Sequence, residues 1–429
     1  MSSQPLKIAV AGLGTVGAEV VRILTRDADL IAARSGRPIV VTDVSARNRD
    51  RDRGIDLLPY TWHDDAAAMA LNAPVDLVVE LVGGADGAAY SIAMGAMAAG
   101  KDVVTANKAM LAKHGVGLAK QAEETSRVLA YEAAVAGGIP IVKALREGLA
   151  GNNVTGIYGI LNGTCNFILT TMRETGRAFA DVLKEAQDLG YAEADPAFDI
   201  DGNDAAQKLA ILASIAFGIP VDEQAVYVSG ITSISADDIA FAEELGYRIK
   251  LLGIARKSVA GIEQRVHPVM LSRSSPLGQI DGVTNAVEVA GDSVGTVVLT
   301  GPGAGGGPTA SAVMSDLIDI ASGRRAPVFG VPFGALKPAP AVPMEALSGA
   351  YYLRLMVNDQ PGVIAAVAGA LGKHGVSIES VLQRGRNPGE VVPVVMVTHE
   401  CNEASISTAL AEIEALSTVA EAPTLIRIA

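Results

Sequence analysis

The sequence predicts an α/β protein with three parts: an N-terminal doubly wound parallel sheet, a mixed α/β middle domain, and a small C-terminal domain of β-α-β-β-α-β order. Over roughly the first third of the chain, apolar strand-like runs alternate with helical patterns, which is typical of βαβ units. A Pro/Ala-rich segment at 335–343, ALKPAPAVP, separates a last block of strands and helices from the rest. Aromatic residues make up only 4% of the chain, which suits tightly packed α/β layers.

The length of 429 residues also favours several domains over one. We expect an N-terminal domain at 1–135 that is completed by about 305–330, and a middle domain at 136–304 that binds substrate and dimerises. A linker at 331–348 then leads to the C-terminal domain at 349–429.

Composition excludes several classes of function. The net charge of −13 argues against a nucleic-acid partner, because no broad basic face is available for phosphates. Only two cysteines occur, Cys165 and Cys401, which indicates no disulfide framework and fits a reducing compartment. The start MSSQPLKIAVAGLG lacks the basic and apolar regions of a signal peptide, and no apolar run is long enough to span a membrane. We therefore expect a cytoplasmic protein with no membrane partner.

The elements of the N-terminal domain follow from apolar periodicity and glycine breaks. The expected strands are 6–11, 39–46, 75–81, 102–105 and 128–132. The expected helices are 18–24, 88–99 and 115–126.

The pattern changes after the Gly-Gly-Ile-Pro of 137–140. The middle domain is expected to have strands at 154–161, 249–257, 263–270, 284–290 and 294–299, and helices at 163–175, 178–189, 203–217, 222–228 and 237–246. A helix at 311–320 is expected to pack back on the N-terminal domain. The C-terminal domain is expected to have strands at 351–357, 377–382, 391–398 and 417–428, and helices at 362–374 and 404–416.

A dinucleotide site is predicted at the first strand-to-helix turn. Gly12, Gly14 and Gly17 form G-x-G-x-x-G directly after a strand. The first glycine permits the tight turn, the second lets the backbone, with Thr15 and Val16, approach a pyrophosphate, and the third allows close packing. A glycine turn can also serve packing alone, but this context favours a Rossmann-type dinucleotide-binding sheet.

The end of the second strand bears on the cofactor. NAD enzymes usually place an acid there, whereas this chain has Arg47, followed by Arg49, Arg51 and Arg53. A guanidinium can pair with a 2′-phosphate, which favours NADP. Asp43 is the rival residue and is expected in mid-strand. A solvated charged loop explains the three later arginines equally well, and NAD stays open.

The most informative segment is 190–208, GYAEADPAFDIDGNDAAQK. Asp204 and Lys208 are four residues apart at the start of an expected helix and so share one face. Such a pair is commonly a surface ion pair. Here Glu193, Asp195 and Asp199 crowd beside it, which suits the binding of a substrate ammonium and the positioning of a lysine.

These residues resemble a known family. Residues 195–208 match D-P-x-x-D-[LI]-x-G-x-D-x-x-x-K, the signature of homoserine dehydrogenases. The resemblance extends over nearly the whole chain: it includes TANK at 105–108, YEAAVAGGIP at 131–140, NGT at 162–164 and GPGAG at 301–305. It implies an NAD(P)-dependent interconversion of L-homoserine and L-aspartate 4-semialdehyde, in threonine, methionine and isoleucine biosynthesis.

The resemblance also implies roles for individual residues. Lys208 would be the general acid/base, positioned by Asp204, and Lys108 would polarise the reacting oxygen or relay its proton. Two lysines meeting at one oxygen would lower each other's pKa. The implied substrate-binding residues are Glu193, Asp199, Asn162, Gly163 and Thr164, and the further cofactor contacts are Thr105, Ala106 and Gly303.

The resemblance further implies a structural monovalent cation, sodium or potassium, at YEAAVAGGIP. Glu132 would supply a carboxylate, and Val135, Gly137 and Ile139 would supply backbone carbonyls. The alternative, that this segment is a glycine-rich hinge between domains, can be true at the same time.

Cys165 stands where threonine is common in this family, and Phe167 where tyrosine is. A thiol here raises a rival class, a semialdehyde dehydrogenase with a thiolate nucleophile. That chemistry needs a nearby histidine, yet none occurs between His114 and His267. A third class, a sensor that binds dinucleotide and amino acid without turnover, stays open.

Residues 351–429 resemble a ferredoxin-like ACT domain. Asn358, Asp359 and Gly362 lie at the expected strand-to-helix turn, where backbone N–H groups can hold the carboxylate of an amino acid. By analogy the effector would be threonine. The alternative is that the domain only oligomerises and buries its edge strands. Either way, the resemblance implies a homodimer or homotetramer.

Overall fold

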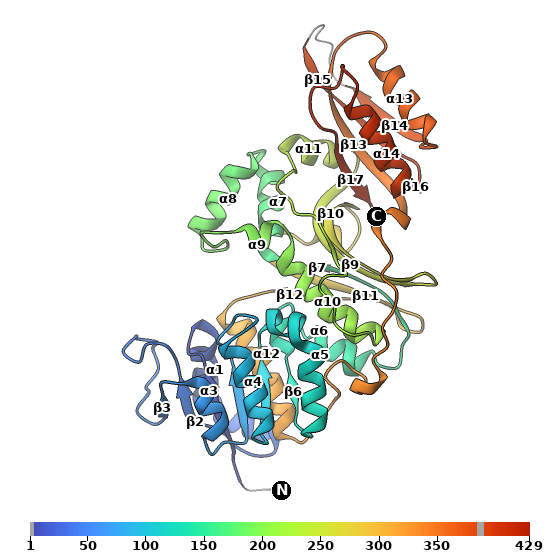
Figure 1. The fold of residues 1–429 in the computed structure, drawn as a ribbon. Coiled ribbons are helices and arrows are strands. Elements are labelled where there is room, and N and C mark those ends of the chain that lie inside the picture. Colours follow the sequence, from blue (N-terminus) through green and yellow to red (C-terminus); the bar gives the residue numbers. More distant parts are fainter. Residues whose placement is uncertain (1–3, 384–389) are drawn as a thin grey trace.

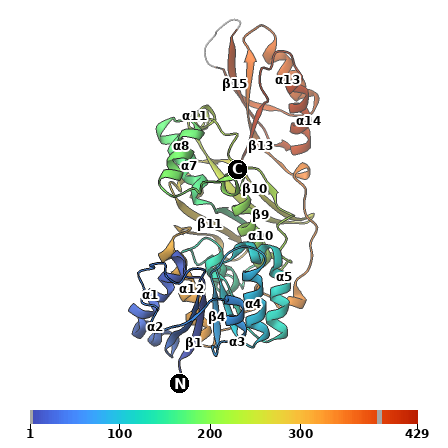
Figure 2. The same cartoon turned by 60° about the vertical axis from the view of Figure 1, so that its left-hand side comes forward.

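The computed structural model describes residues 4–383 and 390–429. Its three parts follow one another along the length of the molecule (Figure 1). The N-terminal sheet domain occupies one end, the mixed domain the middle, and the C-terminal domain the other end, as the turned view in Figure 2 also shows. Among the described residues, no helix has both the length and the apolar character needed to cross a bilayer.

The N-terminal domain is a six-stranded parallel sheet of order β3-β2-β1-β4-β5-β6. Helices cover both faces, which confirms the expected doubly wound fold. The strands are β1 (Leu6–Ala11), β2 (Ile39–Ser45), β3 (Thr61–His63), β4 (Leu77–Glu80), β5 (Asp102–Thr105) and β6 (Leu129–Ala130). The helices are α1 (Thr15–Arg26), α2 (Ala28–Ser35), α3 (Ala66–Asn72), α4 (Ala88–Ala98) and α5 (Lys108–Glu124).

One helix of this domain comes from far along the chain. Helix α12 (Gly306–Ala321) packs against α1, and its Val313 and Leu317 share an apolar core with Ile8 and Val20. The sequence prediction that this segment returns to the first domain is therefore correct. The return brings the N-terminus of α12 beside the N-terminus of α1, since a Cβ on Gly306 would lie 3.0 Å from the Thr15 Cγ2.

Several element predictions were wrong in detail. Helix α5 begins at Lys108 rather than 115, because the Asn107 side chain caps it by accepting a hydrogen bond from the Met110 N–H at 3.0 Å. Residues 222–228 are not a helix and contain only the strand β8 (Tyr227–Val228). The expected strand 128–132 ends before Glu132, which starts a 3₁₀ turn, η1 (Glu132–Ala134). The sequence analysis missed α2, α3 and β3.

The middle domain is built on β7 (Val154–Ile160), β9 (Tyr247–Ser258), β10 (Gly261–Ser272), β11 (Thr284–Gly291) and β12 (Gly295–Pro302). Its helices are α6 (Ile141–Lys143), η2 (Ala144–Gly148), α7 (Gly163–Thr175), α8 (Phe179–Asp188), α9 (Ala197–Ile200), α10 (Asn203–Phe217), α11 (Ala236–Glu244) and η3 (Leu277–Gln279). The connection to the C-terminal domain holds η4 (Phe333–Ala335) and η5 (Met344–Ala346).

The C-terminal domain has the expected β-α-β-β-α-β order. It consists of β13 (Ser348–Asn358), α13 (Val363–Lys373), β14 (Ile378–Gln383), β15 (Val391–Thr398), the short β16 (Cys401–Asn402), α14 (Glu403–Glu414) and β17 (Thr424–Ile428). The last strand is shorter than the predicted 417–428.

The middle and C-terminal domains share one sheet. Its order is β12-β11-β7-β9-β10-β17-β13-β15-β14, and the two domains join where β17 pairs in parallel with β10 through Val269–Arg427 and Met270–Ile428. The C-terminal domain is thus tied to the middle domain by backbone hydrogen bonds as well as by side chains. This continuity could not be predicted, because β-strand pairing between distant segments leaves no local pattern in the sequence.

Candidate active site

A buried carboxylate lies between two lysines that come from different domains. Asp204 is in the first turn of α10, and its Oδ2 lies 2.7 Å from Lys208 Nζ one turn later. Lys108, the first residue of α5, places its Nζ 3.2 Å from Asp204 Oδ1. The Asp204 side chain is 8% exposed and that of Lys108 is 32% exposed, so solvent reaches the cluster on the Lys108 side. The fold therefore brings the two predicted amines together at one carboxylate.

Asp204 is held in its charged form. Burial by itself raises the pKa of this carboxyl, but Lys208, Lys108 and the amide of Asn162 together lower it to about 2. A carboxyl with a lowered pKa contributes stability that is present above its unfolded value and lost as the pH falls towards 2. Asp204 is thus an anion that faces both lysine side chains.

Asn162 connects the parts of the cluster. Its Nδ2 donates to Asp199 Oδ1 and to Asp204 Oδ2, each at 2.8 Å. Its Oδ1 accepts from the Cys165 N–H at 2.8 Å and so caps α7. Burial raises the pKa of Asp199, which lies beside a second carboxylate. One amide therefore sets the spacing of two acids from the 195–208 motif.

Other predicted substrate residues lie around this cluster in different ways. Thr164 Oγ1 donates to the Tyr191 carbonyl at 2.6 Å, and a Cβ on Gly163 would lie 2.8 Å from the Val283 carbonyl oxygen. Glu193 is exposed, and its backbone carbonyl accepts from Gln187 Nε2 at 3.1 Å. The structure does not bring the Glu193 carboxylate into contact with the lysine cluster.

Cys165 is buried inside α7 rather than poised as a nucleophile. Its Sγ donates to the Asp199 carbonyl at 3.2 Å, and the residue is 0% exposed. Burial, followed by the charge of Asp199, raises its pKa well above the ordinary value, so the thiolate is disfavoured. The geometry argues against the thiolate class of enzyme.

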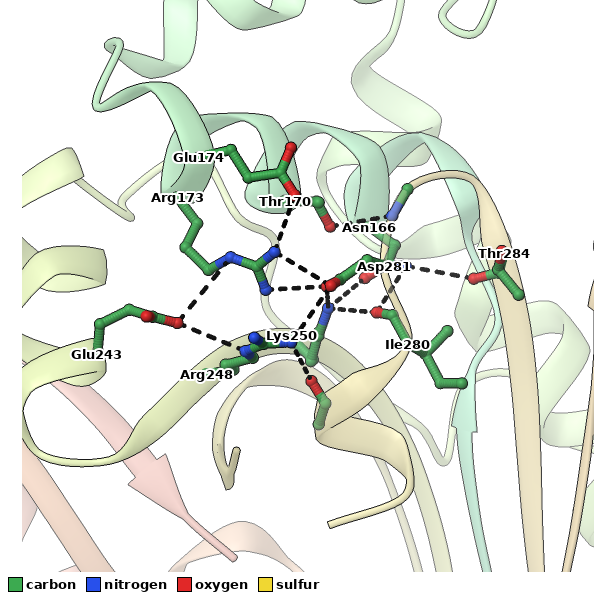
Figure 3. A network of polar contacts seen from close by, with 12 residues as sticks. Asn166, Thr170, Arg173, Glu174, Glu243, Arg248, Lys250, Ile280, Asp281 and Thr284 are labelled. Atoms are coloured by element: carbon green, nitrogen blue, oxygen red, sulfur yellow. Dashed lines mark hydrogen bonds and ion pairs between the residues drawn. The ribbon is translucent and has the colours of Figure 1, made fainter. Parts of the chain in front are cut away.

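A polar network behind α7 supports the cluster, and sequence reasoning missed it. Figure 3 shows Arg173, Arg248 and Lys250 converging on Asp281. Lys250 Nζ also donates to Asn166 Oδ1 at 3.0 Å, in the first turn of the helix that Asn162 caps. Burial lowers the pKa of Lys250 to about 8, despite the nearby Asp281. The network fixes α7 against β9 and so holds Asn162 in place.

The glycine loop after β1 has the geometry expected of a phosphate cradle. Gly12 has φ of +99°, and a Cβ there would lie 2.4 Å from the Leu81 carbonyl oxygen. A Cβ on Gly17 would lie 1.9 Å from the Gly12 carbonyl oxygen, so only glycine allows α1 to approach the loop. A Cβ on Gly14 would meet no atom within 4 Å, which leaves open space at the N-terminus of α1, beside Thr15 and Val16.

The residues after β2 form a loop folded over Trp62. Arg49 and Arg53 each place their guanidinium carbon 5.8 Å from the centre of the Trp62 ring, and Arg53 Nε donates to the Leu13 carbonyl at 3.1 Å. Arg47 is exposed at the end of the strand. Asp43, the rival residue, is buried in mid-strand, and its Oδ1 lies 2.7 Å from His63 Nε2. The Asp43 carboxylate is therefore already paired with His63.

Sequence reasoning also missed Glu80, at the end of β4. Its Oε2 accepts from Thr105 Oγ1 at 2.6 Å, and its Oε1 accepts from the Val82 N–H at 2.7 Å. Thr105 Oγ1 in turn accepts from the Asn107 N–H at 3.0 Å, next to Ala106 and directly before α5. The sequence signal for Glu80 was its position near the end of the apolar run VDLVVEL, because an acidic side chain in a buried strand needs a hydrogen-bond partner.

The segment predicted to hold a cation lies where the two larger domains meet. The Glu132 carboxylate accepts from the backbone N–H groups of Val142 and Lys143 at 2.9 and 2.8 Å. Burial, followed by the charge of Asp316, raises the pKa of Glu132 to about 7. Val135, Gly137 and Ile139 are buried, and a Cβ on Gly137 would lie 2.4 Å from the Gly303 carbonyl oxygen.

The predicted effector turn lies at the start of α13. The N–H of Asn358 donates to the Thr418 carbonyl at 2.9 Å, and Gly362 is the N-cap residue of the helix, with φ of +95°. Within residues 4–383 and 390–429, Asp359 Oδ2 is buried without a hydrogen-bond partner.

Family models agree with the three-part division. A model described as homoserine dehydrogenase, NAD binding domain, matches residues 12–132, and one described as homoserine dehydrogenase matches residues 140–318. A model described as ACT domain matches residues 351–418.

Full-length relatives and solved structures are similar to the chain throughout. Homoserine dehydrogenase of Pseudomonas aeruginosa is 45% identical over 432 residues, covering 99% of each chain, and that of Neisseria gonorrhoeae is 46% identical over 430 residues, covering 99% of this chain and 98% of its own. A crystal structure of a homoserine dehydrogenase from Thiobacillus denitrificans has a TM-score of 0.94 at 44% identity, covering 99% of this chain and 98% of its own. A hyperthermophilic archaeal homoserine dehydrogenase in complex with NADPH has a TM-score of 0.63 at 28% identity, covering 74% of this chain and 97% of its own.

Proposed function

The chain belongs to the homoserine dehydrogenase family, and we propose that Lys208 and Lys108, held by Asp204, carry its proton transfer. The enzyme is an oxidoreductase that interconverts L-homoserine and L-aspartate 4-semialdehyde with a nicotinamide dinucleotide. The single observation behind the proposal is the pair of lysine Nζ atoms 2.7 and 3.2 Å from the two oxygens of one buried carboxylate.

The proposed acid/base is Lys208. During reduction of the aldehyde its ammonium donates a proton to the carbonyl oxygen, and during oxidation its neutral amine accepts the hydroxyl proton. The Leu161 carbonyl, 2.8 Å from Lys208 Nζ, and Asp204 fix the direction of the amine. Lys108 approaches from the N-terminal domain and polarises the same oxygen. A bound nicotinamide supplies or accepts the hydride.

The substrate ammonium is proposed to bind the acids of the 195–208 motif. Asp199 is linked to the lysine cluster through Asn162, and Gly163 and Thr164, at the start of α7, are proposed to line the substrate pocket. Glu193 would have to turn inward from its exposed position to take part.

The dinucleotide fits the first domain because the space at Gly14 lies at the N-terminus of α1. We propose that Gly12, Thr15, Val16 and Gly17 complete the diphosphate cradle. The other proposed contacts are Thr105, Ala106, Lys108 and Gly303. Arg47 is proposed to bind the 2′-phosphate of NADP, because it is exposed at the end of β2 and Asp43 is committed to His63.

Replacing Arg47 by alanine is expected to raise KM for NADP by roughly 10-fold and to leave KM for NAD unchanged, since only the phosphate contact is lost. Steady-state kinetics with each cofactor measures this. The exposed Arg51→Ala variant is the control, and an equal change for both cofactors would contradict the role of Arg47.

A structural sodium or potassium ion is proposed at Glu132 with the carbonyls of Val135, Gly137 and Ile139. The donor set fits a hard cation, because Glu132 is a buried carboxylate beside a second one, Asp316, whose Oδ2 accepts the Glu132 N–H at 2.8 Å. The ion would offset this buried negative charge and fix the junction between the domains.

The C-terminal domain is proposed to bind threonine at Asn358, Asp359 and Gly362, where Asp359 Oδ2 lacks a hydrogen-bond partner among the described residues. We further propose that the enzyme is cytoplasmic and assembles as a homodimer or homotetramer. Its domain boundaries are proposed to lie near residues 135, 304 and 348. Light scattering coupled to size exclusion measures the assembly.

Cys165→Ser is expected to keep kcat for homoserine oxidation within about threefold of the wild type, because the buried Sγ only donates to a backbone carbonyl and a serine hydroxyl can replace it. The free energy of unfolding is expected to fall by an amount on the order of 1 kcal/mol, which urea denaturation measures. A loss of all activity with an intact fold would restore the thiolate hypothesis.

The overall proposal is tested by absorbance at the reduced-nicotinamide band, with homoserine and each cofactor, with and without threonine. We expect turnover with homoserine, faster with NADP, and inhibition by threonine. Tight binding of both ligands without turnover would instead indicate a sensor.

A further inference from the structure

A cavity of about 40 Å³ lies at the junction of the middle and C-terminal domains, away from the lysine cluster. It is lined by β10, by the start of β13, by α14 and by β17. Its polar walls are Arg265, His267, Tyr351, Glu403 and Arg427. Since one water needs about 10–15 Å³ of such space, the cavity holds roughly three groups of that size.

Two of these lining residues carry a buried nitrogen that lacks a hydrogen-bond partner among the described residues: His267 Nε2 and Arg265 Nε. His267 is 1% exposed, and its Nδ1 lies 2.9 Å from the Pro268 carbonyl oxygen, to which it donates. Burial lowers the pKa of His267 to about 3, so the ring is neutral and Nε2 is an acceptor. A buried unpartnered acceptor is costly unless something donates to it.

The remaining charged groups already satisfy one another. Glu403 accepts from the Tyr351 hydroxyl at 2.8 Å and from Arg427 Nε at 3.0 Å. Among the described residues, Arg265 forms an ion pair with Glu263, whose Oε2 lies 3.8 Å from Nη2. The charges of Arg427, Arg256 and Glu403 also act on Arg265. The cavity therefore presents a spare donor with positive charge at Arg265 and a spare acceptor at His267.

We propose that this cavity is a binding site for a small carboxylic acid that carries a hydroxyl or amino group. Its carboxylate pairs with Arg265 and its hydroxyl or ammonium donates to His267 Nε2. The size of the cavity restricts the ligand to a few heavy atoms. The site is separate from the effector turn at 358–362, which lies at the opposite end of β13.

The strand that carries Arg265 and His267 packs against the start of the helix that carries Asp204 and Lys208. Val266 lies between Arg265 and His267 in the sequence, and its Cγ1 would be 3.2 Å from a Cβ on Gly202, the N-cap residue of α10. The Val266 carbonyl accepts from the Ser229 N–H at 2.8 Å. Because α10 carries Asp204 and Lys208, a ligand that shifts β10 is expected to change KM for homoserine.

The test is isothermal titration of the full-length enzyme with glycolate and with glycine, the smallest hydroxy and amino carboxylic acids. We expect one site per chain, with binding weakened at least 10-fold in His267→Phe. Gly349→Val is the second variant: Gly349 lines the cavity, and a Cβ there meets no atom within 4 Å, so valine is expected to fit without a clash and to narrow the cavity with its polar groups intact. The exposed His399→Phe variant is the matched control and should bind normally.

Three outcomes overturn the proposal: no binding of either acid, binding unaffected by both cavity variants, or binding lost instead in Asp359→Asn or Asp199→Asn, which would place the acid at the effector turn or the active site. Saturating acid is expected to change KM for homoserine at least twofold in the wild type and not in Gly349→Val. An unchanged KM in the wild type would overturn the link to Gly202.

Discussion

Replacing Lys208 by alanine is expected to lower kcat for homoserine oxidation by about 10³-fold, because the hydroxyl proton loses its acceptor. Dinucleotide affinity is expected to stay unchanged, since Lys208 contacts Asp204 and the Leu161 carbonyl and not the glycine loop. Stopped-flow absorbance measures the hydride step, and fluorescence titration of the reduced cofactor measures binding.

The chain offers a matched control for this variant. Lys184 and Asp188 form an i,i+4 pair at 3.7 Å on α8, with the same spacing as Asp204 and Lys208 but with both side chains exposed. Lys184→Ala should leave kcat unchanged, since exposed pairs contribute little. If kcat fell by less than tenfold in Lys208→Ala, Lys108 would be able to serve as the base, and the assignment of Lys208 would fail.

The contact between Asp204 and Lys208 could be predicted because the two residues are neighbours in the sequence. Asp204 and Lys208 are four apart on one helix, and that spacing alone places them on a common face. Lys108 came only from the family resemblance, because nothing local indicates that the start of α5 faces α10. The 3.2 Å contact between Lys108 and Asp204 depends on how two domains pack.

Residues that act through partners distant in sequence escaped prediction. Glu80 and Thr105 pair across adjacent parallel strands, and Lys250 reaches Asn166 from another element. Each is unremarkable in its own stretch of sequence, because a buried polar residue shows its purpose only when its partner is known. The same reason hid the continuous sheet through β10 and β17.

The second large effect is expected at Asp238 on α11, which contacts β13 of the continuous sheet. Its carboxylate is fully buried and accepts from Arg354 Nε at 2.7 Å and from the Tyr352 hydroxyl at 3.1 Å, both on β13. It also accepts from the Ser235 N–H at 3.0 Å, which closes the capping box of its own helix. One side chain thus joins the helix start to the C-terminal domain.

Replacing Asp238 by alanine is expected to destabilise the contact between the two domains by about 3–5 kcal/mol, because Arg354 would be left as a buried charge without its partner. Urea denaturation should show the C-terminal domain separating at a lower concentration, and limited proteolysis should cut faster within 331–348. Asp237→Ala is the matched control, being the exposed neighbour in the same helical turn. Equal effects of the two variants would mean that backbone pairing of β10 with β17 alone holds the domains together, and that Asp238 serves only its own helix.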